Sequence, residues 1–210
     1  MSPFSRFYNL TDDKQKKILE SAVSEFTQRG FDGASLNQII STAGLSKGSF
    51  YYYFENKIDL LVGVLEAFFS PDFIIILDEL KQSSDATKFW SIFRNVSIKQ
   101  VAKWFDNPWG LKLSGFIVGL PDHVTSGNQM TNYMGKWMGV LATLIEHGQN
   151  IGALRSDLPM PVMQKLWMSN DQIITRWIVE EWEQSTMKQR EKLIDLSIGL
   201  FRRLFSPIVD

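Results

Sequence analysis

The sequence contains no cysteine and only two histidines among its 210 residues. Without cysteine, neither a disulfide framework nor a thiolate metal site can form. Neither His123 nor His147 has the spacing of a zinc motif such as H-E-x-x-H. The sequence also lacks a nucleophile elbow, a P-loop and a Rossmann glycine pattern. We therefore predict that the protein is not an enzyme and uses neither a metal nor a cofactor.

Long apolar runs are also missing. The longest clusters, such as FIIIL at residues 73–77, are too short to cross a bilayer. Residues 1–11 are mixed and polar, unlike a signal peptide. We therefore expect a cytoplasmic protein, and a hydrophobic content of 44% is sufficient for a sizeable core.

The chain as a whole lacks an excess of either charge, with a net charge of −1. That balance argues against non-specific adhesion to nucleic acid. The charge is unevenly placed, however: residues 1–60 contain seven basic and seven acidic residues, whereas residues 86–140 contain six basic and two acidic ones. All seven tryptophans follow residue 85. The composition therefore indicates two units with different roles.

Helix signals occur along the whole chain, and no strand alternation is sustained, so we predict an all-α fold. Thr11 is the expected N-cap of a first helix, which Gly30 ends in the C′ position. Ser35 and Gln38 form a capping box that opens a second helix. Gly44 ends this second helix after about two turns.

The remaining helices follow from the same signals. Ser46 caps a third helix, and Asn56 with Asp59 opens a fourth, which Pro71 ends or interrupts. Further helices are predicted over residues 73–81, 88–105, 110–120, 129–149, 161–183 and 187–204.

The stretch LSKGSFYYYFENK, residues 45–57, places five aromatic residues in a row. A helix, a turn containing glycine and a second short helix form a helix-turn-helix, whose second helix enters the DNA major groove. At 100° per residue Phe50 and Phe54 share one side of this helix, so we expect them to pack into the core. Tyr51 and Tyr52 then point outward, where a tyrosine suits the wall of a DNA groove.

The sequence FDGASLNQIISTAGLSKGSFYYYFENKIDLL resembles the DNA-binding domain of the TetR family of transcriptional regulators. The family pattern is present almost without a gap over residues 30–61, and residues 14–29 are similar to the preceding family helix. Leu36 departs from it, because many members carry Thr or Val there. The capping role stays with Ser35.

The resemblance implies which side chains contact DNA. The family's phosphate contacts correspond to Ser35, Ser49, Tyr52 and Lys57. Its base-facing contacts correspond to Lys47, Gly48 and Tyr51, and Tyr53 turns either toward phosphate or into the core. The complete predicted set of DNA-binding residues is Ser35, Ser46, Lys47, Gly48, Ser49, Tyr51, Tyr52, Tyr53 and Lys57.

The resemblance also implies a two-domain organisation and a function. We predict a helix-turn-helix DNA-binding domain at residues 11–70 and an effector-binding and dimerisation domain at residues 71–210. The last two predicted helices are rich in large apolar residues and would pair in a homodimer. The expected function is a ligand-responsive regulator, most simply a repressor, that binds double-stranded operator DNA of pseudo-palindromic sequence through residues 47–54.

The expected effector is small and apolar, and no membrane partner is expected. Candidate residues of an effector pocket are Trp90, Phe93, Trp104, Phe105, Phe116, Met134, Trp137 and Trp167, although any one of them could equally belong to the core or the dimer interface. The alternative function is an interaction or small-molecule-binding protein that keeps the helix-turn-helix but has lost DNA binding.

Overall fold

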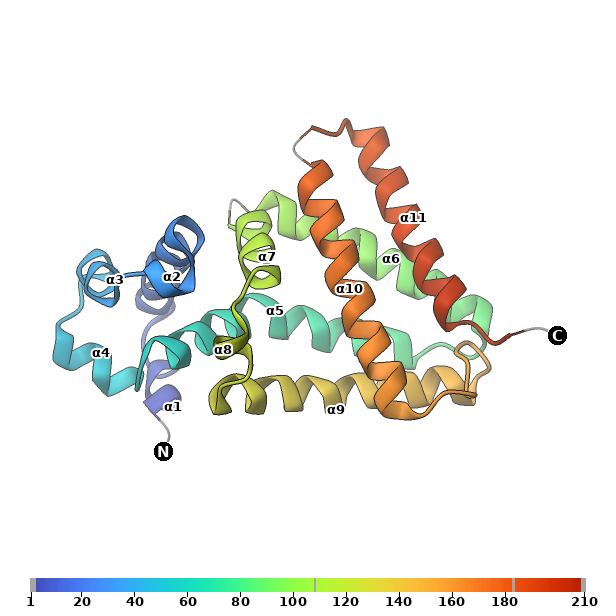
Figure 1. The fold of residues 1–210 in the computed structure, drawn as a ribbon, viewed down its shortest axis with the longest axis horizontal. Helices are drawn as coiled ribbons and strands as arrows, with labels where there is room; N and C mark the ends of the chain where they lie inside the picture. The colour runs from blue at the N-terminus through green and yellow to red at the C-terminus, as the bar shows by residue number, and fades with distance from the viewer. Residues whose placement is uncertain (1–2, 108, 183, 209–210) are drawn as a thin grey trace. The chain divides into compact units, whose positions relative to one another are not determined.

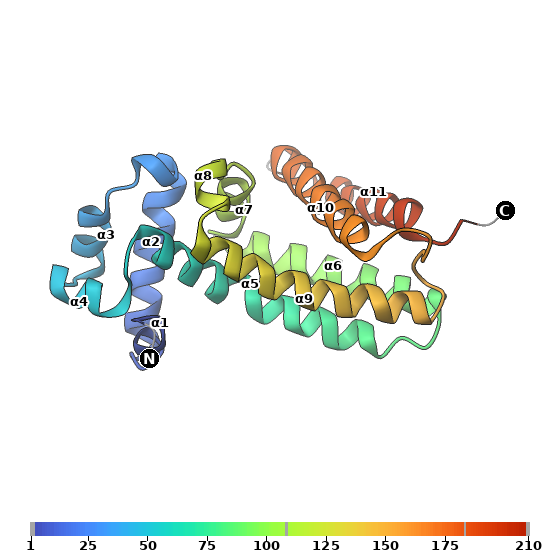
Figure 2. The same cartoon turned by 60° about the horizontal axis from the view of Figure 1, so that its bottom comes forward.

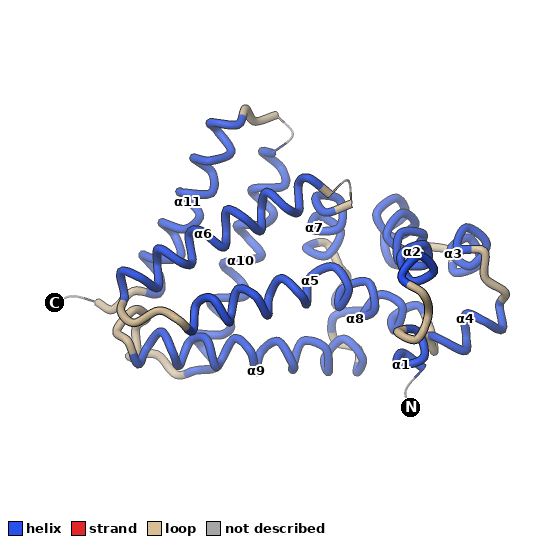
Figure 3. Tube along the Cα trace, turned by 180° about the vertical axis from the view of Figure 1, so that it is seen from behind, coloured by secondary structure: helices blue, strands red, loops and turns tan. Residues whose placement is uncertain are grey.

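The computed structural model describes residues 3–107, 109–182 and 184–208. This part of the chain is helical and contains no strand (Figure 3), so the predicted all-α class is confirmed. The helices are α1 (Pro3–Phe7), α2 (Asp12–Gly33), α3 (Leu36–Ala43), α4 (Lys47–Tyr53), α5 (Lys57–Lys81), α6 (Ala86–Asp106), α7 (Gly110–Val118), α8 (Asp122–Thr125), α9 (Asn128–Asn150), α10 (Met160–Trp182) and α11 (Met187–Phe205), shown in Figure 1.

By their internal contacts the helices form two compact units. The first comprises Met1–Pro71 and Gly119–Met134, and the second comprises Asp72–Val118 and Gly135–Asp210. The segment Gly119–Met134, which carries α8, thus contacts the N-terminal helices although it follows α7 in sequence.

In the first unit, α2 buries an apolar stripe that includes Ile18, Ala22 and Phe26, at the spacing expected of one helix face. Gly30 breaks the helical geometry with φ 69°, in the left-handed region that favours glycine. The predicted loop after Gly30 is instead one further helical turn. Its Phe31 is buried and stacks on Phe26 at 5.8 Å between ring centroids, which explains why this turn forms.

The cap of α3 differs in part from the predicted capping box. Ser35 Oγ accepts from the backbone N–H of Gln38 at 3.3 Å, as expected. The Gln38 side chain, however, donates to Thr42 Oγ1 at 3.2 Å and not back toward Ser35. The N–H of Ser35 donates instead to Glu25 Oε1 at 2.9 Å. A carboxylate from α2 therefore completes the cap of α3.

The start of α5 is capped as predicted, because the N–H of Asp59 donates to Asn56 Oδ1 at 2.9 Å. The prediction that Pro71 ends or interrupts the helix is confirmed as an interruption: α5 extends from Lys57 to Lys81 but is bent at a break between Lys57–Phe69 and Ile74–Lys81. A proline removes one backbone hydrogen bond and its ring clashes with a carbonyl of the preceding turn, so it bends a helix that continues past it. Among the described helices, none alone has the length and apolar composition of a membrane span; the two parts of α5, Lys57–Phe69 and Ile74–Lys81, pass that test only when combined.

The second unit packs α6, α7, α10 and α11 against one another. Figures 1 and 2 both show α10 and α11 side by side. The observed α6, α7, α9, α10 and α11 agree with their predicted ranges to within two residues at each end. The sequence did not indicate α8, which lies in the predicted break before α9.

Candidate nucleic-acid interface

The aromatic run of α4 has two faces. Phe50 and Phe54 are completely buried, whereas Tyr51 and Tyr52 are 50% and 53% exposed. The ring centroids of Phe50 and Phe54 lie 5.5 Å apart. The phenylalanines thus anchor the helix and leave the tyrosines at the surface, in the arrangement predicted by helical winding. Tyr53 is half-buried and packs edge-on against Tyr52 at 5.3 Å.

The first turn of α4 is capped by a side chain and largely exposed. Ser46 Oγ accepts from the backbone N–H of Ser49 at 3.0 Å and lies 2.8 Å from Ser49 Oγ. These contacts fix where the helix begins. Lys47 and Gly48 lie exposed beside them. A Cβ at Gly48 would meet no atom closer than Ser46 Oγ at 3.9 Å, so nothing within the unit requires glycine there, and its small size leaves room for an approaching backbone.

Lys57, predicted to bind phosphate, holds two backbone carbonyls in the structure. Its Nζ donates to the carbonyl oxygens of Asp32 at 3.2 Å and Ala34 at 3.1 Å. The ammonium also lies 4.7 Å from the centroid of the Phe31 ring. Lys57 therefore ties the start of α5 to the α2–α3 connection. An ammonium has three N–H donors, so one remains for a further acceptor.

Glu25 supports this region and was not found from the sequence. It is buried, with 7% of its surface exposed, and accepts from Arg29 Nε at 3.2 Å as well as from the N–H of Ser35. A buried carboxylate requires such partners. The sequence signal was an acidic residue next to Phe26 on the apolar stripe of α2, where a charge is unusual.

The predicted effector-pocket residues divide into several groups. Trp90, Phe93, Trp137 and Trp167 are buried in the second unit. Phe93 contacts Trp90 and Trp167 edge-on at 5.6 and 5.7 Å, so these three rings pack against one another. Their mutual packing is typical of a core.

The other pocket candidates do not extend this cluster. Phe116 is half-buried on α7, and Met134 falls in the first unit. The side chains of Trp104 and Phe105 lie outside the described part of the chain.

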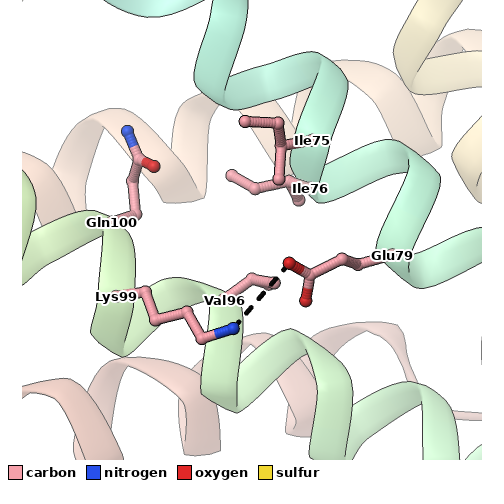
Figure 4. Close-up of a pocket in the computed structure, with 6 residues that line it drawn as sticks. All are labelled: Ile75, Ile76, Glu79, Val96, Lys99 and Gln100. Carbon is pink, nitrogen blue, oxygen red and sulfur yellow. Dashed lines mark ion pairs between the residues drawn. The ribbon is translucent and has the colours of Figure 1, made fainter.

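A shallow hollow of about 50 Å³ lies between α5 and α6 and involves none of the candidates. Figure 4 shows its lining residues, with an ion pair of 3.8 Å between Lys99 and Glu79. Ligand pockets usually enclose about 300–1,000 Å³, so this hollow is too small for an effector.

The last two helices present a second apolar face to solvent. Trp167, Ile174 and Ile178 of α10 are buried, whereas Ile173 is 67% exposed. The exposed large apolar residues of α10 and α11 follow helical spacing, and they are Val162, Leu166, Ile173, Leu196, Leu200 and Leu204. Each helix therefore has one face in the core and one exposed apolar stripe.

Comparison with known proteins agrees with the geometry of the first unit. The family model described as bacterial regulatory proteins, tetR family, matches residues 18–64. The HTH-type transcriptional regulator YuxN of Bacillus subtilis is 34% identical over 76 residues, 36% of this chain and 26% of that protein. RutR of Escherichia coli is 46% identical over 52 residues, 25% of this chain and 24% of that protein. The matched segments span about half or less of the first curated relatives' lengths, from 26% to 54%.

Solved structures share the fold over nearly the whole chain. A TetR-family transcription regulator from Shewanella sp. PV-4 superimposes with a TM-score of 0.72 at 22% identity, covering 91% of this chain and 97% of that one. FadR from Bacillus subtilis, in complex with stearoyl-CoA, superimposes with a TM-score of 0.68 at 14% identity, covering 88% and 96%. The solved structures share the helical fold of the chain, and the family-model match and the curated relatives agree with the helix-turn-helix geometry: residues 18–64 form a DNA-binding domain of the TetR family of transcriptional regulators.

Proposed function

We propose that the protein is a ligand-responsive transcriptional regulator, most simply a repressor, that binds a pseudo-palindromic operator as a homodimer through α4. The observation that carries this proposal is the two-faced α4. Its phenylalanines are fully buried, while Tyr51, Tyr52 and Lys47 are exposed. Such a helix is held firmly and offers polar donors on its outer side, as a recognition helix must.

The proposed contacts divide by role. Lys47 and Tyr51 face base edges, where a lysine can reach guanine acceptors and a tyrosine ring can pack on a thymine methyl group. Gly48 allows the helix to approach the groove closely. The phosphate contacts are Ser35, Ser49, Tyr52 and Lys57, with Ser46 and Tyr53 at the edges of the same surface.

The exposed apolar stripes of α10 and α11 support the proposed dimer. Ile173, Leu196 and Leu200 are each more than two-fifths exposed. Two copies of such a helix pair can form a four-helix interface that removes these side chains from water. In the complex, the two recognition helices would lie about 34 Å apart, one turn of B-DNA.

For the effector we propose a neutral or anionic apolar molecule. A cationic ligand in an apolar site generally needs a buried carboxylate or an aromatic cage. Residues 86–140 carry only Asp106 and Asp122 as acids. The solved FadR from Bacillus subtilis, whose fold is similar, was crystallised with stearoyl-CoA, an acyl chain on an anionic carrier.

The effector test is a titration of neutral, acidic and quaternary ammonium apolar compounds, with operator release and tryptophan fluorescence as readouts. A hundredfold loss of operator affinity needs about 2.7 kcal/mol of coupling. Linkage requires operator DNA to weaken effector binding by the same factor. Release by quaternary ammonium compounds alone would overturn the charge argument.

The decisive test of the regulatory function is a gel shift with the region upstream of the protein's own gene. We expect a discrete complex that survives competition by random-sequence DNA. The rival function, an interaction protein that has lost DNA binding, predicts no complex with either DNA. Repression is tested separately, by a reporter whose expression should rise when the protein is absent.

A further inference from the structure

The N-terminal helix α1 packs against the proposed recognition helix α4. Neither the sequence pattern nor the family-model match, which begins at residue 18, includes α1. Its Arg6 lies over the ring of Tyr52, with Cζ 4.6 Å from the ring centroid. Tyr52 is itself 53% exposed on the outer face of α4. A cation from outside the helix-turn-helix therefore stands on the surface proposed to meet DNA.

Buried contacts hold α1 in this place. Phe7, the next residue after Arg6, is completely buried, and its ring lies 5.1 Å from that of Phe54. Tyr8 donates its hydroxyl proton to Glu66 Oε2 at 3.0 Å. Gln15 Nε2 donates to the carbonyl oxygen of Leu10 at 2.8 Å. The residues directly after Arg6 are thus tied to α2, α4 and α5, so the position of Arg6 is set by the fold.

The charge of Arg6 is available for a ligand. Arg6 is exposed, and no carboxylate of the described residues lies within ion-pair distance of it. A guanidinium held over an aromatic ring keeps its in-plane N–H donors free. Those donors match the geometry of a phosphate group and can bind it with two parallel hydrogen bonds.

We propose that Arg6, held over the Tyr52 ring by α1, contacts a DNA backbone phosphate and extends the DNA-binding surface beyond the helix-turn-helix. The assignment rests on the proposed DNA-binding function. A phosphate is favoured over a base edge because Tyr52, on whose ring the Arg6 side chain lies, is itself one of the residues assigned to phosphate. The contact is therefore independent of DNA sequence.

The experiment measures affinity for a random-sequence duplex between 50 and 200 mM salt, using wild type and Arg6→Ala. Each lost phosphate contact should lower the salt slope by about 0.9. Raising the salt from 50 to 200 mM should therefore weaken DNA binding by Arg6→Ala about 3.5-fold less than it weakens binding by wild type, for each bound chain. Lys16→Ala is the charge-matched control, because Lys16 is exposed on α2 and already pairs with Glu20 at 4.0 Å. Its slope should stay near that of wild type.

Three outcomes would overturn the proposal. An unchanged slope for Arg6→Ala, with wild type still binding DNA, removes the Arg6 contact and leaves the proposed function intact. An equal effect from Lys16→Ala assigns the change to total charge. Failure of wild type to bind either random or upstream DNA overturns both the proposed function and this contact.

The role of the ring is tested in two Tyr52 backgrounds. Tyr52→Phe keeps the ring, so Arg6→Ala should lower the slope as it does in wild type. Tyr52→Leu removes the ring, and the Arg6→Ala effect should shrink. An effect of equal size in both backgrounds would show that Tyr52 does not place Arg6. Thermal unfolding of each variant verifies that Phe7 still anchors α1.

Discussion

At the scale of single residues, truncating Phe50 should lower the stability of the protein, whereas truncating its neighbour Tyr51 should lower its affinity for DNA. Phe50 is fully buried, so Phe50→Ala should destabilise the protein by about 3–5 kcal/mol as a core truncation. Tyr51 is half-exposed, so Tyr51→Ala should change stability by less than about 0.5 kcal/mol. It should instead cost about 1–3 kcal/mol of binding at the operator and less at other sequences. Thermal unfolding and operator affinity check the pair; unfolding by Tyr51→Ala alone would mean that the proposed face is wrong.

Lys57 should show a double effect, because the structure gives it an internal role besides the proposed contact with DNA. Lys57→Met keeps the alkyl stem near Phe31 but removes the ammonium that binds the carbonyls of Asp32 and Ala34. We expect a loss of about 1 kcal/mol in stability, typical of a net hydrogen-bond contribution. Binding to all DNA sequences should weaken alike, and the salt slope should fall by about 1. A loss of stability with an unchanged slope would make Lys57 a purely structural residue.

At the scale of elements, the hydrogen bond that attaches the end of α1 to α5 should stabilise the protein less as the pH rises into the alkaline range. Burial, and then the Glu66 carboxylate, raise the pKa of Tyr8 above its ordinary value of 10.0. The folded state thus favours the protonated hydroxyl that donates to Glu66. Tyr8 therefore contributes its full stability below the unfolded pKa near 10, and loses it as the pH rises through the higher folded pKa.

The variant Tyr8→Phe lacks both the hydrogen bond and the titration. Its melting temperature should be lower than that of wild type at pH 8, by an amount equivalent to about 1 kcal/mol. The gap should shrink above pH 10, as the unfolded wild type begins to ionise. Tyr51→Phe is the matched control, since Tyr51 is 50% exposed and Tyr8 48%. If the difference in melting temperature between wild type and Tyr8→Phe stayed constant up to pH 11, the Tyr8 hydroxyl would not stabilise the attachment of α1.

At the scale of the whole molecule, the exposed stripes of α10 and α11 predict a dimer at micromolar concentration. Ile173→Glu and Leu200→Glu each place a carboxylate in the proposed interface, where two copies would bury it without a partner. Both variants should sediment as folded monomers and lose cooperative operator binding. Lys188→Glu, at an exposed charged position of α11, should remain a dimer. A wild type that sediments as a monomer and binds single half-sites tightly would contradict the dimer.

Local signals sufficed for most of the fold and for part of the site. Capping residues, helical spacing and the short connections indicated nearly every helix, because these signals act within a few residues of one another. They failed at residues 31–33, where Phe31 stacks on Phe26 and the helix gains a further turn. There the outcome depends on packing against another side chain.

The sequence by itself determined the all-α class, the helix-turn-helix and the division of α4 into buried phenylalanines and exposed tyrosines. Winding alone separates residues 50 and 54 from residues 51 and 52, so no tertiary knowledge was needed. Only the tertiary structure decided that Glu25 caps α3, that Lys57 holds the α2–α3 connection and that Arg6 stands over Tyr52. Each of these contacts joins separate helices across many residues of sequence. A pattern that repeats every few residues carries no information about which distant side chains the packed core brings together.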